Sequence, residues 1–336
     1  TTPGIEIKIK GDHSLNKRNM KKLIELMSKF GAQFKPKNKF NFPLKLISSE
    51  MPIAIKYSAG VSAQLKSAVI FAALNSYGNT EVIEQEISRD HTEKMLMNNA
   101  QTIKINKREK KIIKIIGKNN ISPVNINVPG DPSSAAFFTA LTLLNKNSAI
   151  KIKNVGLNPT RIGFYELLKK QGANIKFNNL RKENNELRGD IFVKSSKIKP
   201  IKASKKYYVK STDEYPILFI IAALTKGIST FKGIGDLANK ESNRIKEMQK
   251  ILKQVDIKSV SSGNELKIFG KEKIDIKGKK IIVPNLGDHR ICMSSFVLSI
   301  LLGSKILIKN FETVYTSSPS FLNIMKLLGV KFEIRK

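Results

Sequence analysis

The sequence predicts an α/β fold built from one unit of strands and helices that is used several times. Four helices that are apolar on every side each follow a short polar segment, and each is followed by a β-rich run. An amphipathic helix and a further strand come next, so that the whole unit recurs roughly every 70 to 80 residues. Helices that are apolar all round must be covered. We therefore expect them to lie buried beneath sheets, with their starts directed toward a common face.

The repeated elements can be assigned in chain order. The apolar helices are expected at 65–74, 135–144, 216–224 and 291–302, and the β-rich runs at 79–85, 149–155, 228–234 and 305–311. The amphipathic helices are expected at 89–99, 159–172, 240–254 and 318–329, with further strands at 173–177 and 330–334. Turns marked by glycine or asparagine end the helices, as is usual for such connections.

The first segment, residues 5–34, contains a strand, a turn, an amphipathic helix, a glycine and a strand, which is only the second half of the unit. The chain therefore carries five amphipathic helices and four apolar ones. We expect the first repeat to be incomplete, with further protein before it. A break at Pro129-Gly130 predicts two domains: residues 1–128, the remainder of the first domain, and residues 129–336, with three repeats.

The composition is globular and strongly basic, with 41% apolar residues and a formal net charge of +33. The lysines are scattered along every segment and form no basic tail. This distribution favours a surface that attracts small anions over a nucleic-acid site. Cys292 is the only cysteine and the three histidines lie far apart, so we expect no disulfide framework and no metal site. No apolar run reaches the ~18 residues of a membrane span.

Arginine is rare in this chain, with nine among the 60 basic residues, and five of the nine are expected at helix starts. These five are Arg18, Arg89, Arg161, Arg244 and Arg290. A cation at a helix N-terminus is disfavoured by about 0.3–1 kcal/mol. We therefore expect these arginines to hold anions between the guanidinium group and free backbone N–H groups, an arrangement that suits carboxylates and phosphates.

Eight short strings are more specific than the repeat. In chain order they are GDHSLNKR, SAQLKSA, SRDHTEKM, VPGDPSSAAF, NPTRIGF, DEYPIL, NKESNRI and GDHRICM. Together they span most of the chain, and the chain resembles the 5-enolpyruvylshikimate-3-phosphate synthase family, specifically its second, bacterial class. The resemblance implies a two-domain enolpyruvyl transferase fold of repeated βαβαββ units, an inside-out α/β barrel, that closes on its substrates between the domains.

The resemblance also implies the reaction. The enolpyruvyl group of phosphoenolpyruvate is transferred to the 5-hydroxyl of shikimate 3-phosphate and phosphate is released, in the pathway to chorismate and the aromatic amino acids. No cofactor or metal is implied. We expect a monomeric, cytoplasmic enzyme whose partners are these two small anions, with no nucleic-acid or membrane partner. The chain begins without a methionine, so its targeting stays open.

By motif position, the resemblance assigns phosphoenolpyruvate binding to four residues: Arg18, Gln64, Arg244 and Arg290. Three guanidinium groups suit a ligand that carries both a phosphate and a carboxylate. Each arginine also has a purely structural interpretation. Arg244 could pair on the helix surface with Glu241 or Glu247. Arg290 could be a first-turn residue behind an N-cap at Asp288.

Shikimate 3-phosphate binding is assigned in the same way to six residues: Ser62, Ala63, Gln64, Arg89, Asp213 and Lys240. Hydroxyl and backbone N–H groups at a helix start fit a phosphate. The structural alternatives are a plain serine N-cap at Ser62 and, after Arg89, a capping box formed by Asp90 and Glu93.

Three of the matched residues carry the chemistry. Addition of a hydroxyl to the enol carbon needs a base for the hydroxyl and an acid for the adjacent methylene. Asp213 matches the family's proton acceptor and Glu241 its expected proton donor, while Lys240 is expected to neutralise substrate charge. The alternative for Asp213 and Glu214 is a favourable acidic first turn. Arg161 is given no ligand role, although Asn158-Pro159 before it predicts a helix start.

The chain departs from the family pattern at several places. The usual KESDR reads KESNR, with Asn243 in place of aspartate, and the usual SFP reads Ser317-Ser318-Pro319. The approach to Lys240 reads Leu-Ala-Asn in place of Leu-Arg-Val. The N-terminal PGDKSxSxR string and the GNxGT loop do not occur in the chain. We therefore expect this chain to be an incomplete fragment with weak activity or none.

Three other functions remain possible from the sequence. A UDP-N-acetylglucosamine enolpyruvyl transferase shares the fold, but its loop cysteine has no counterpart, since Cys292 falls inside a helix. A dinucleotide-binding oxidoreductase would use Gly233-Ile-Gly235-Asp-Leu-Ala238 with Asp256. Asp256 is expected to open the next strand and not to end it, so we interpret this fingerprint as coincidental. A basic repeat protein that binds nucleic acid would show a steep dependence of affinity on salt.

Overall fold

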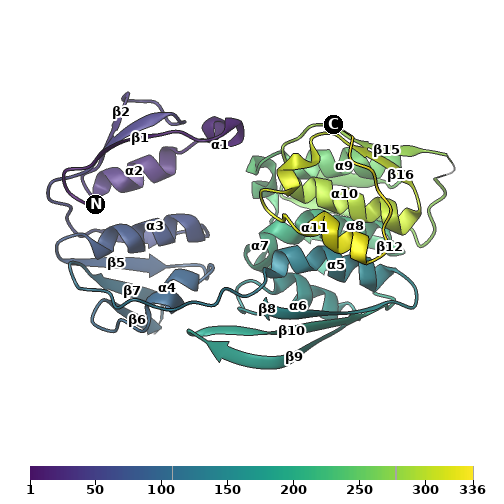
Figure 1. Ribbon diagram of the computed structural model, residues 1–336, viewed down its shortest axis with the longest axis horizontal. Coiled ribbons are helices and arrows are strands. Elements are labelled where there is room, and N and C mark those ends of the chain that lie inside the picture. The colour runs from purple at the N-terminus through teal and green to yellow at the C-terminus, as the bar shows by residue number, and fades with distance from the viewer. Residues whose placement is uncertain (108, 277, 336) are drawn as a thin grey trace. The chain divides into compact units, whose positions relative to one another are not determined.

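The computed structural model describes residues 1–107, 109–276 and 278–335, apart from the side chains of His13, Ser14 and Lys107. The chain forms two compact units (Figure 1). Unit 1 comprises Thr1–Asn127 with Lys182–Glu186, and unit 2 comprises Val128–Arg181 with Leu187–Lys336. Each unit has its own hydrophobic core, and each is described separately below.

Unit 1 contains two sheets and four helices. Its helices are α1 (His13–Lys17), α2 (Lys21–Lys29), α3 (Ala63–Leu74) and α4 (His91–Leu96). Its strands are β1 (Glu6–Ile9), β2 (Gln33–Lys35), β3 (Leu44–Ile47), β4 (Lys56–Ala59), β5 (Asn79–Glu84), β6 (Ile103–Lys107) and β7 (Lys111–Ile116). The strand orders are β1-β3-β2 and β4-β5-β7-β6. Helices α2 and α3 pack against each other between these sheets (Figure 1).

Unit 2 contains three sheets around a helical centre. Its α-helices are α5 (Pro132–Leu144), α6 (Gly163–Lys170), α7 (Lys205–Ser211), α8 (Tyr215–Ala223), α9 (Arg244–Gln254), α10 (His289–Leu302) and α11 (Phe321–Leu327), and its 3-10 helices are η1 (Thr212–Glu214), η2 (Gly235–Asn239) and η3 (Phe311–Val314). Its strands are β8 (Ala149–Gly156), β9 (Asn174–Glu183), β10 (Glu186–Lys194), β11 (Lys202–Ala203), β12 (Gly227–Lys232), β13 (Ser259–Ser262), β14 (Glu265–Gly270), β15 (Lys280–Val283) and β16 (Lys305–Ile308). The sheet orders are β8-β10-β9, β11-β12-β14-β13 and β15-β16.

Helices α5, α8 and α10 contact one another at the centre of unit 2 (Figure 1). Every residue of α8 is buried, as are ten consecutive residues of α10 from Arg290 to Ser299. A helix that is apolar on all sides cannot present a polar face to water, so it is stable only when covered all round. The sheets and the amphipathic helices provide that cover. This confirms the inside-out α/β arrangement that the sequence predicts.

The four repeats share one connection. In three of them a short strand pairs in parallel with the strand that follows the apolar helix: β4 with β5, β11 with β12, and β15 with β16. In the fourth, Gly130 forms a parallel bridge to Val155 of β8. A parallel crossover of this kind requires an intervening helix. The recurrence of the same β-α-β step is the structural counterpart of the repeat seen in the sequence.

Two glycines show how closely the repeats match. An ideal Cβ atom at Gly117 would lie 1.9 Å from the carbonyl oxygen of Ser76, just beyond the end of α3. At Gly270, which ends β14, the Cβ atom would lie 2.0 Å from the carbonyl oxygen of Thr225, just beyond the end of α8. At both positions a strand end approaches the backbone at the end of the apolar helix too closely for any side chain.

Several sequence predictions about local structure are wrong. The expected strand at 330–334 does not form, and residues 330–335 join no sheet in the described part of the chain. Asn158-Pro159 forms a turn in which Asn158 Oδ1 accepts a bond from the backbone N–H of Thr160 at 2.9 Å, so α6 begins only at Gly163. This local bond competes with helix formation.

The dinucleotide fingerprint is also excluded by the fold. Gly235 begins a 3-10 helix, not the α-helix that binds a pyrophosphate, and β12 pairs antiparallel to β14. Asp256 does not open the next strand but lies in a turn with φ 56°. Among the described residues, no helix is both long and apolar enough to cross a lipid bilayer. The same residues contain no group of three His, Cys, Asp or Glu side chains that could hold a metal ion.

Candidate functional site

Two candidate carboxylates of unit 2, Asp213 and Glu241, lie around the guanidinium group of Arg244. This residue begins α9 and is 1% exposed. Its Nε donates to Asp288 Oδ2 at 2.9 Å, and its Nη2 donates to Glu241. Its Nη1 lies 3.8 Å from Asp213 Oδ1. The alternative ion pair between Arg244 and Glu247 on the helix surface does not form, because Glu247 pairs with Lys250. The contact between Arg244 and Glu241 does form, but its guanidinium group is buried and not on the surface.

Asp288 joins the starts of two helices. As N-cap of α10 it accepts from the backbone N–H of Arg290 at 3.0 Å, while its other oxygen accepts from Arg244 and from Ser242 Oγ. Burial raises the pKa of Asp288, but the charge and hydrogen bond of Arg244 outweigh burial and hold the pKa below its usual range. The structural interpretation of Asp288 as a cap is therefore confirmed. The same carboxylate also fixes Arg244.

Arg290 lies in the first turn of α10 and is 8% exposed. Its Nε and Nη1 atoms are buried and have no hydrogen-bond partner among the residues that the structure describes. Buried guanidinium N–H groups are costly to leave unpaired. They lie where the free N–H groups of a helix start also favour an anion. This arrangement is suited to a carboxylate or a phosphate.

Lys240 and Glu241 connect η2 to α9. Lys240 Nζ lies 2.7 Å from Asp236 Oδ2, which also accepts from the hydroxyl of Tyr208 at 2.8 Å. Asn243 is the N-cap of α9 and accepts from the backbone N–H of Lys246 at 3.1 Å. Asparagine in place of the family's usual aspartate therefore still caps the helix. Asp213 lies in η1, directly before α8.

A second cluster of charged and polar side chains connects other helix starts of unit 2. Arg161 Nη2 donates to Asp131 Oδ1 at 2.7 Å and to Ser133 Oγ at 2.9 Å, and Asp131 is the N-cap of α5. Ser133 Oγ in turn donates to Glu214 Oε1 at 2.5 Å. Burial, followed by the charge of Asp213, raises the pKa of Glu214. The burial of Glu214 against α5 could not be predicted from the sequence, since an acidic residue before a helix is ordinarily exposed.

In unit 1, Ser62 is the N-cap of α3, and its Oγ accepts from the backbone N–H of Leu65 at 3.3 Å. Ala63 begins the helix, and the side chain of Gln64 is exposed. Arg89 is half-buried and lies directly before Asp90, the N-cap of α4. Arg18 is exposed and follows the end of α1, so its predicted place at a helix start is wrong. The cause is the extra turn of helix that Asp12 caps through the backbone N–H of Leu15.

The capping box predicted at Asp90 and Glu93 does not form. Asp90 makes no side-chain cap bond, and Glu93 turns inward, where it lies 2.8 Å from Lys66 Nζ. Lys66 is 0% exposed on α3. Its position within the apolar string LKSAVIFAAL was a signal for a buried partner, because lysine is almost never fully buried unless it is paired.

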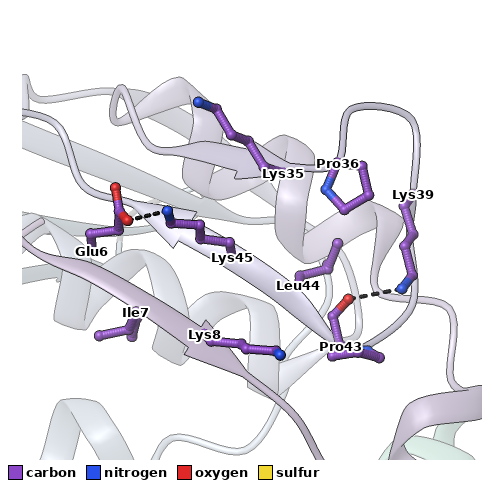
Figure 2. Close-up of a pocket in the computed structure, with 9 residues that line it drawn as sticks. All are labelled: Glu6, Ile7, Lys8, Lys35, Pro36, Lys39, Pro43, Leu44 and Lys45. Atoms are coloured by element: carbon purple, nitrogen blue, oxygen red, sulfur yellow. Dashed lines mark hydrogen bonds and ion pairs between the residues drawn. The ribbon is translucent and has the colours of Figure 1, made fainter.

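A cavity of about 640 Å³ lies on the sheet β1-β3-β2 (Figure 2). Its lining is Glu6, Ile7, Lys8, Lys35, Pro36, Lys39, Pro43, Leu44 and Lys45, which includes none of the candidate residues. Two of its four lysines are already engaged, Lys45 with Glu6 and Lys39 with the carbonyl oxygen of Pro43. We assign it no part in the site.

Comparison with known proteins places these residues in a family. Residues 1–325 match the family EPSP synthase (3-phosphoshikimate 1-carboxyvinyltransferase). A 3-phosphoshikimate 1-carboxyvinyltransferase of Petrotoga mobilis is 39% identical over 320 residues, which are 95% of this chain and 73% of that protein. One of Paramagnetospirillum magneticum is 36% identical over 326 residues, 96% of this chain and 73% of that protein.

Solved structures agree with this comparison. The EPSP synthase of Acinetobacter baumannii is similar with a TM-score of 0.82 and 33% identity, over 99% of this chain and 75% of that one. The enolpyruvyl transferase NikO of Streptomyces tendae shares the fold with a TM-score of 0.72 at 11% identity, over 97% of this chain and 73% of that one. The chain thus spans about three quarters of the length of these proteins.

Proposed function

The chain belongs to the EPSP synthase family, and from that premise we propose how its residues carry out the family's reaction. The reaction transfers the enolpyruvyl group of phosphoenolpyruvate to the 5-hydroxyl of shikimate 3-phosphate and releases phosphate. One observation supports the proposal most strongly: Arg244 and Arg290 lie at adjacent helix starts joined by Asp288, next to the carboxylates of Asp213 and Glu241.

Phosphoenolpyruvate is proposed to bind Arg244 and Arg290 in unit 2, with Gln64 and Arg18 of unit 1 as further ligands. The Nε and Nη1 groups of Arg290, which are buried and have no hydrogen-bond partner among the described residues, support its role, since a phosphate or carboxylate oxygen accepts charge-assisted bonds from such donors. Arg244 is fixed on one side by Asp288. Within the described part of the chain its Nη1 has no hydrogen-bond partner, so it is proposed to donate to the substrate.

Shikimate 3-phosphate is proposed to bind Ser62, Ala63, Gln64 and Arg89 of unit 1, and Asp213 and Lys240 of unit 2. The hydroxyl of Ser62 already accepts the cap bond from Leu65, but it can still donate its own proton to a phosphate oxygen. The backbone N–H groups of the first turn of α3 and the cation of Arg89 would complete a phosphate site.

Asp213 and Glu241 are proposed to move the protons. The carboxylate of Asp213 takes the proton of the 5-hydroxyl as the new C–O bond forms, and Glu241 gives a proton to the methylene carbon, which becomes a methyl group. Loss of phosphate then breaks the older C–O bond. Glu241 takes one methyl proton back, which restores the C=C bond. Lys240, beside Glu241 in the chain, balances the negative charge of the substrates.

We further propose that the two compact units are the two catalytic domains, and that the enzyme is a monomeric cytoplasmic protein without a nucleic-acid partner. The even distribution of lysine along the chain supports small anions as ligands. Fluorescence anisotropy with duplex DNA tests the alternative, because a nucleic-acid protein would bind with an affinity that falls steeply with salt.

The first test is calorimetric binding of shikimate 3-phosphate to the 336-residue chain, together with phosphate release when phosphoenolpyruvate is added. We expect saturable binding that Arg89→Ala weakens, and slow release or none. A folded chain without any affinity for shikimate 3-phosphate would refute the binding roles. Release as fast as in the relatives would refute the expectation of weak activity.

A further inference from the structure

Four charged side chains form a closed ring in the interior of unit 1. Lys66 Nζ lies 2.7 Å from Glu84 Oε1 and 2.8 Å from Glu93 Oε1. Lys111 Nζ lies 2.7 Å from Glu84 Oε2 and 2.9 Å from Glu93 Oε1. Each lysine therefore contacts both glutamates, and each glutamate contacts both lysines. The formal charges of these four side chains, which we call the charge ring, sum to zero.

The charge ring is buried to an unusual degree. The side chains of Lys66 and Glu84 are 0% exposed and that of Glu93 is 1% exposed, while Lys111 at 14% is the most accessible. Burial raises the pKa of Glu84, but hydrogen bonds from Lys111, Lys66 and Ser88 outweigh burial and hold the pKa at about 2. The carboxylate is therefore charged at neutral pH.

Stability alone does not account for such a ring. Desolvation of buried ions costs about as much as their attraction returns, and apolar side chains of similar volume often give an equal or greater free energy of unfolding. A buried ring of this kind does fix the positions of its side chains, because each side chain has few other positions in which its ion pairs are retained. The question is which parts of unit 1 the charge ring fixes.

The charge ring connects the two segments that are proposed to bind shikimate 3-phosphate. Lys66 lies two residues after Gln64 on α3. Glu84 Oε1 accepts from the backbone N–H of Ser88 at 2.9 Å and from Ser88 Oγ at 2.8 Å, and Arg89 is the next residue. One carboxylate oxygen thus binds both the α3 lysine and the loop that carries Arg89.

A second contact joins the same two helices. Ser67 Oγ and Thr92 Oγ1 lie 2.7 Å apart, which connects α3 to α4 on the far side of Arg89 in the sequence. Glu93 of the charge ring also lies on α4. The loop at Arg89 is therefore held on both sides, through Ser88 before it and through Thr92 and Glu93 after it.

We propose that Lys66, Glu84, Glu93 and Lys111 are positioning residues that hold Arg89 and Gln64 at the separation needed to bind shikimate 3-phosphate. None of the four is proposed to touch the substrate. They act through Ser88 and through the first turns of α3 and α4. This inference rests on the proposed binding roles of Arg89 and Gln64.

The decisive variant is the double substitution Lys66→Met with Glu84→Gln. It removes one cation and one anion, so the remaining Lys111 and Glu93 still balance, and it leaves no single buried charge without a partner. The matched control is Lys21→Met with Glu25→Gln, an exposed i,i+4 pair on α2 in the same unit. Ser88→Ala is a milder second variant that removes one hydrogen bond to Glu84 and no charge.

Calorimetry with shikimate 3-phosphate measures the effect on affinity. We expect the ring variant to bind about tenfold more weakly, Ser88→Ala to bind a few-fold more weakly, and the α2 control to bind like the wild type. Urea unfolding of the same proteins is expected to stay cooperative. Hydrogen exchange of amides 86–94 is expected to be faster in the ring variant, as it would be if the Arg89 loop lost its anchor.

A double-mutant cycle separates a positioning role from a general loss of structure. If the charge ring acts through Arg89, Arg89→Ala in the ring variant should cost much less affinity than Arg89→Ala in the wild type. Fully additive losses would overturn the proposal. Unchanged affinity in both the ring variant and Ser88→Ala would also overturn it. If the ring variant does not fold, the affinity of Ser88→Ala alone decides whether the proposal holds. If Arg89→Ala itself binds normally, the binding role of Arg89 is wrong and the inference falls with it.

Discussion

Arg244 Nε donates to Asp288 Oδ2 at 2.9 Å, and this bond connects the first residue of α9 to the N-cap of α10. The guanidinium group is 1% exposed and the carboxylate 0%. Because the same carboxylate also receives the backbone N–H of Arg290, the two arginines proposed to bind phosphoenolpyruvate share one support. Their relative position is set by a side chain that neither substrate is proposed to touch.

Replacement of Asp288 by asparagine is expected to lower the free energy of unfolding by about 3 kcal/mol, since the buried charge of Arg244 would lose its most buried carboxylate partner. Asparagine still caps a helix, so the loss should come from the charge and not from the cap. Chemical denaturation checks the value. Asp256→Asn, at an exposed carboxylate paired with Lys279, is the matched control and should leave the free energy of unfolding nearly unchanged. Equal effects of the two substitutions would contradict this account.

Arg290→Lys is expected to weaken phosphoenolpyruvate binding by about tenfold or more, because lysine keeps the charge but not the paired planar N–H groups. Calorimetry in the presence of shikimate 3-phosphate measures the change. Arg181→Lys serves as control, since Arg181 is exposed and donates to Asn154 away from the proposed site. Unchanged affinity in Arg290→Lys would remove Arg290 from the proposed ligands.

Acidification is expected to destabilise the fold through His289. Burial, followed by the charge of Arg290, lowers the pKa of His289 to about 4. The unfolded chain therefore binds more protons than the folded one between about pH 6.5 and pH 4. This contribution to stability is present above pH 6.5 and is lost as the pH falls. Between pH 7 and pH 5 the wild type should lose about 2 kcal/mol more than His289→Asn, as measured by urea unfolding at each pH. Parallel pH profiles would show that His289 does not titrate in this way.

Gly270→Ala is expected to cost about 3 kcal/mol or more, or to prevent folding, because the added Cβ atom would lie 2.0 Å from one backbone oxygen and 2.1 Å from another. Gly60→Ala is the control: its Cβ atom would meet nothing within 4 Å, and its φ is not in the left-handed region. The melting temperatures of the two variants give the comparison. A stable Gly270→Ala protein would show that the end of α8 can shift.

The repeat could be predicted from the sequence because its signal is local. An apolar helix of nine or more residues with no polar face must be buried, and the β-rich run after each such helix is marked by its own alternating pattern. These constraints identified α3, α5, α8 and α10 and the strands after them. The local signals failed where a side chain had several possible partners, as at Asp90, Glu93 and Asn158.

Motif position alone was sufficient to select Asp213, Glu241, Arg244 and Arg290 as candidates. It could not show that Arg244 lies within reach of Asp213, Glu241 and Asp288, because these contacts join residues up to 44 positions apart. Nor could it show that Lys66, Glu84, Glu93 and Lys111 form one ring. The sequence by itself determined which elements form and which residue types stand at their starts, since helix burial and capping depend on near neighbours. Only the tertiary structure decided which charges are paired and which guanidinium groups remain available, because pairing depends on distances across the fold.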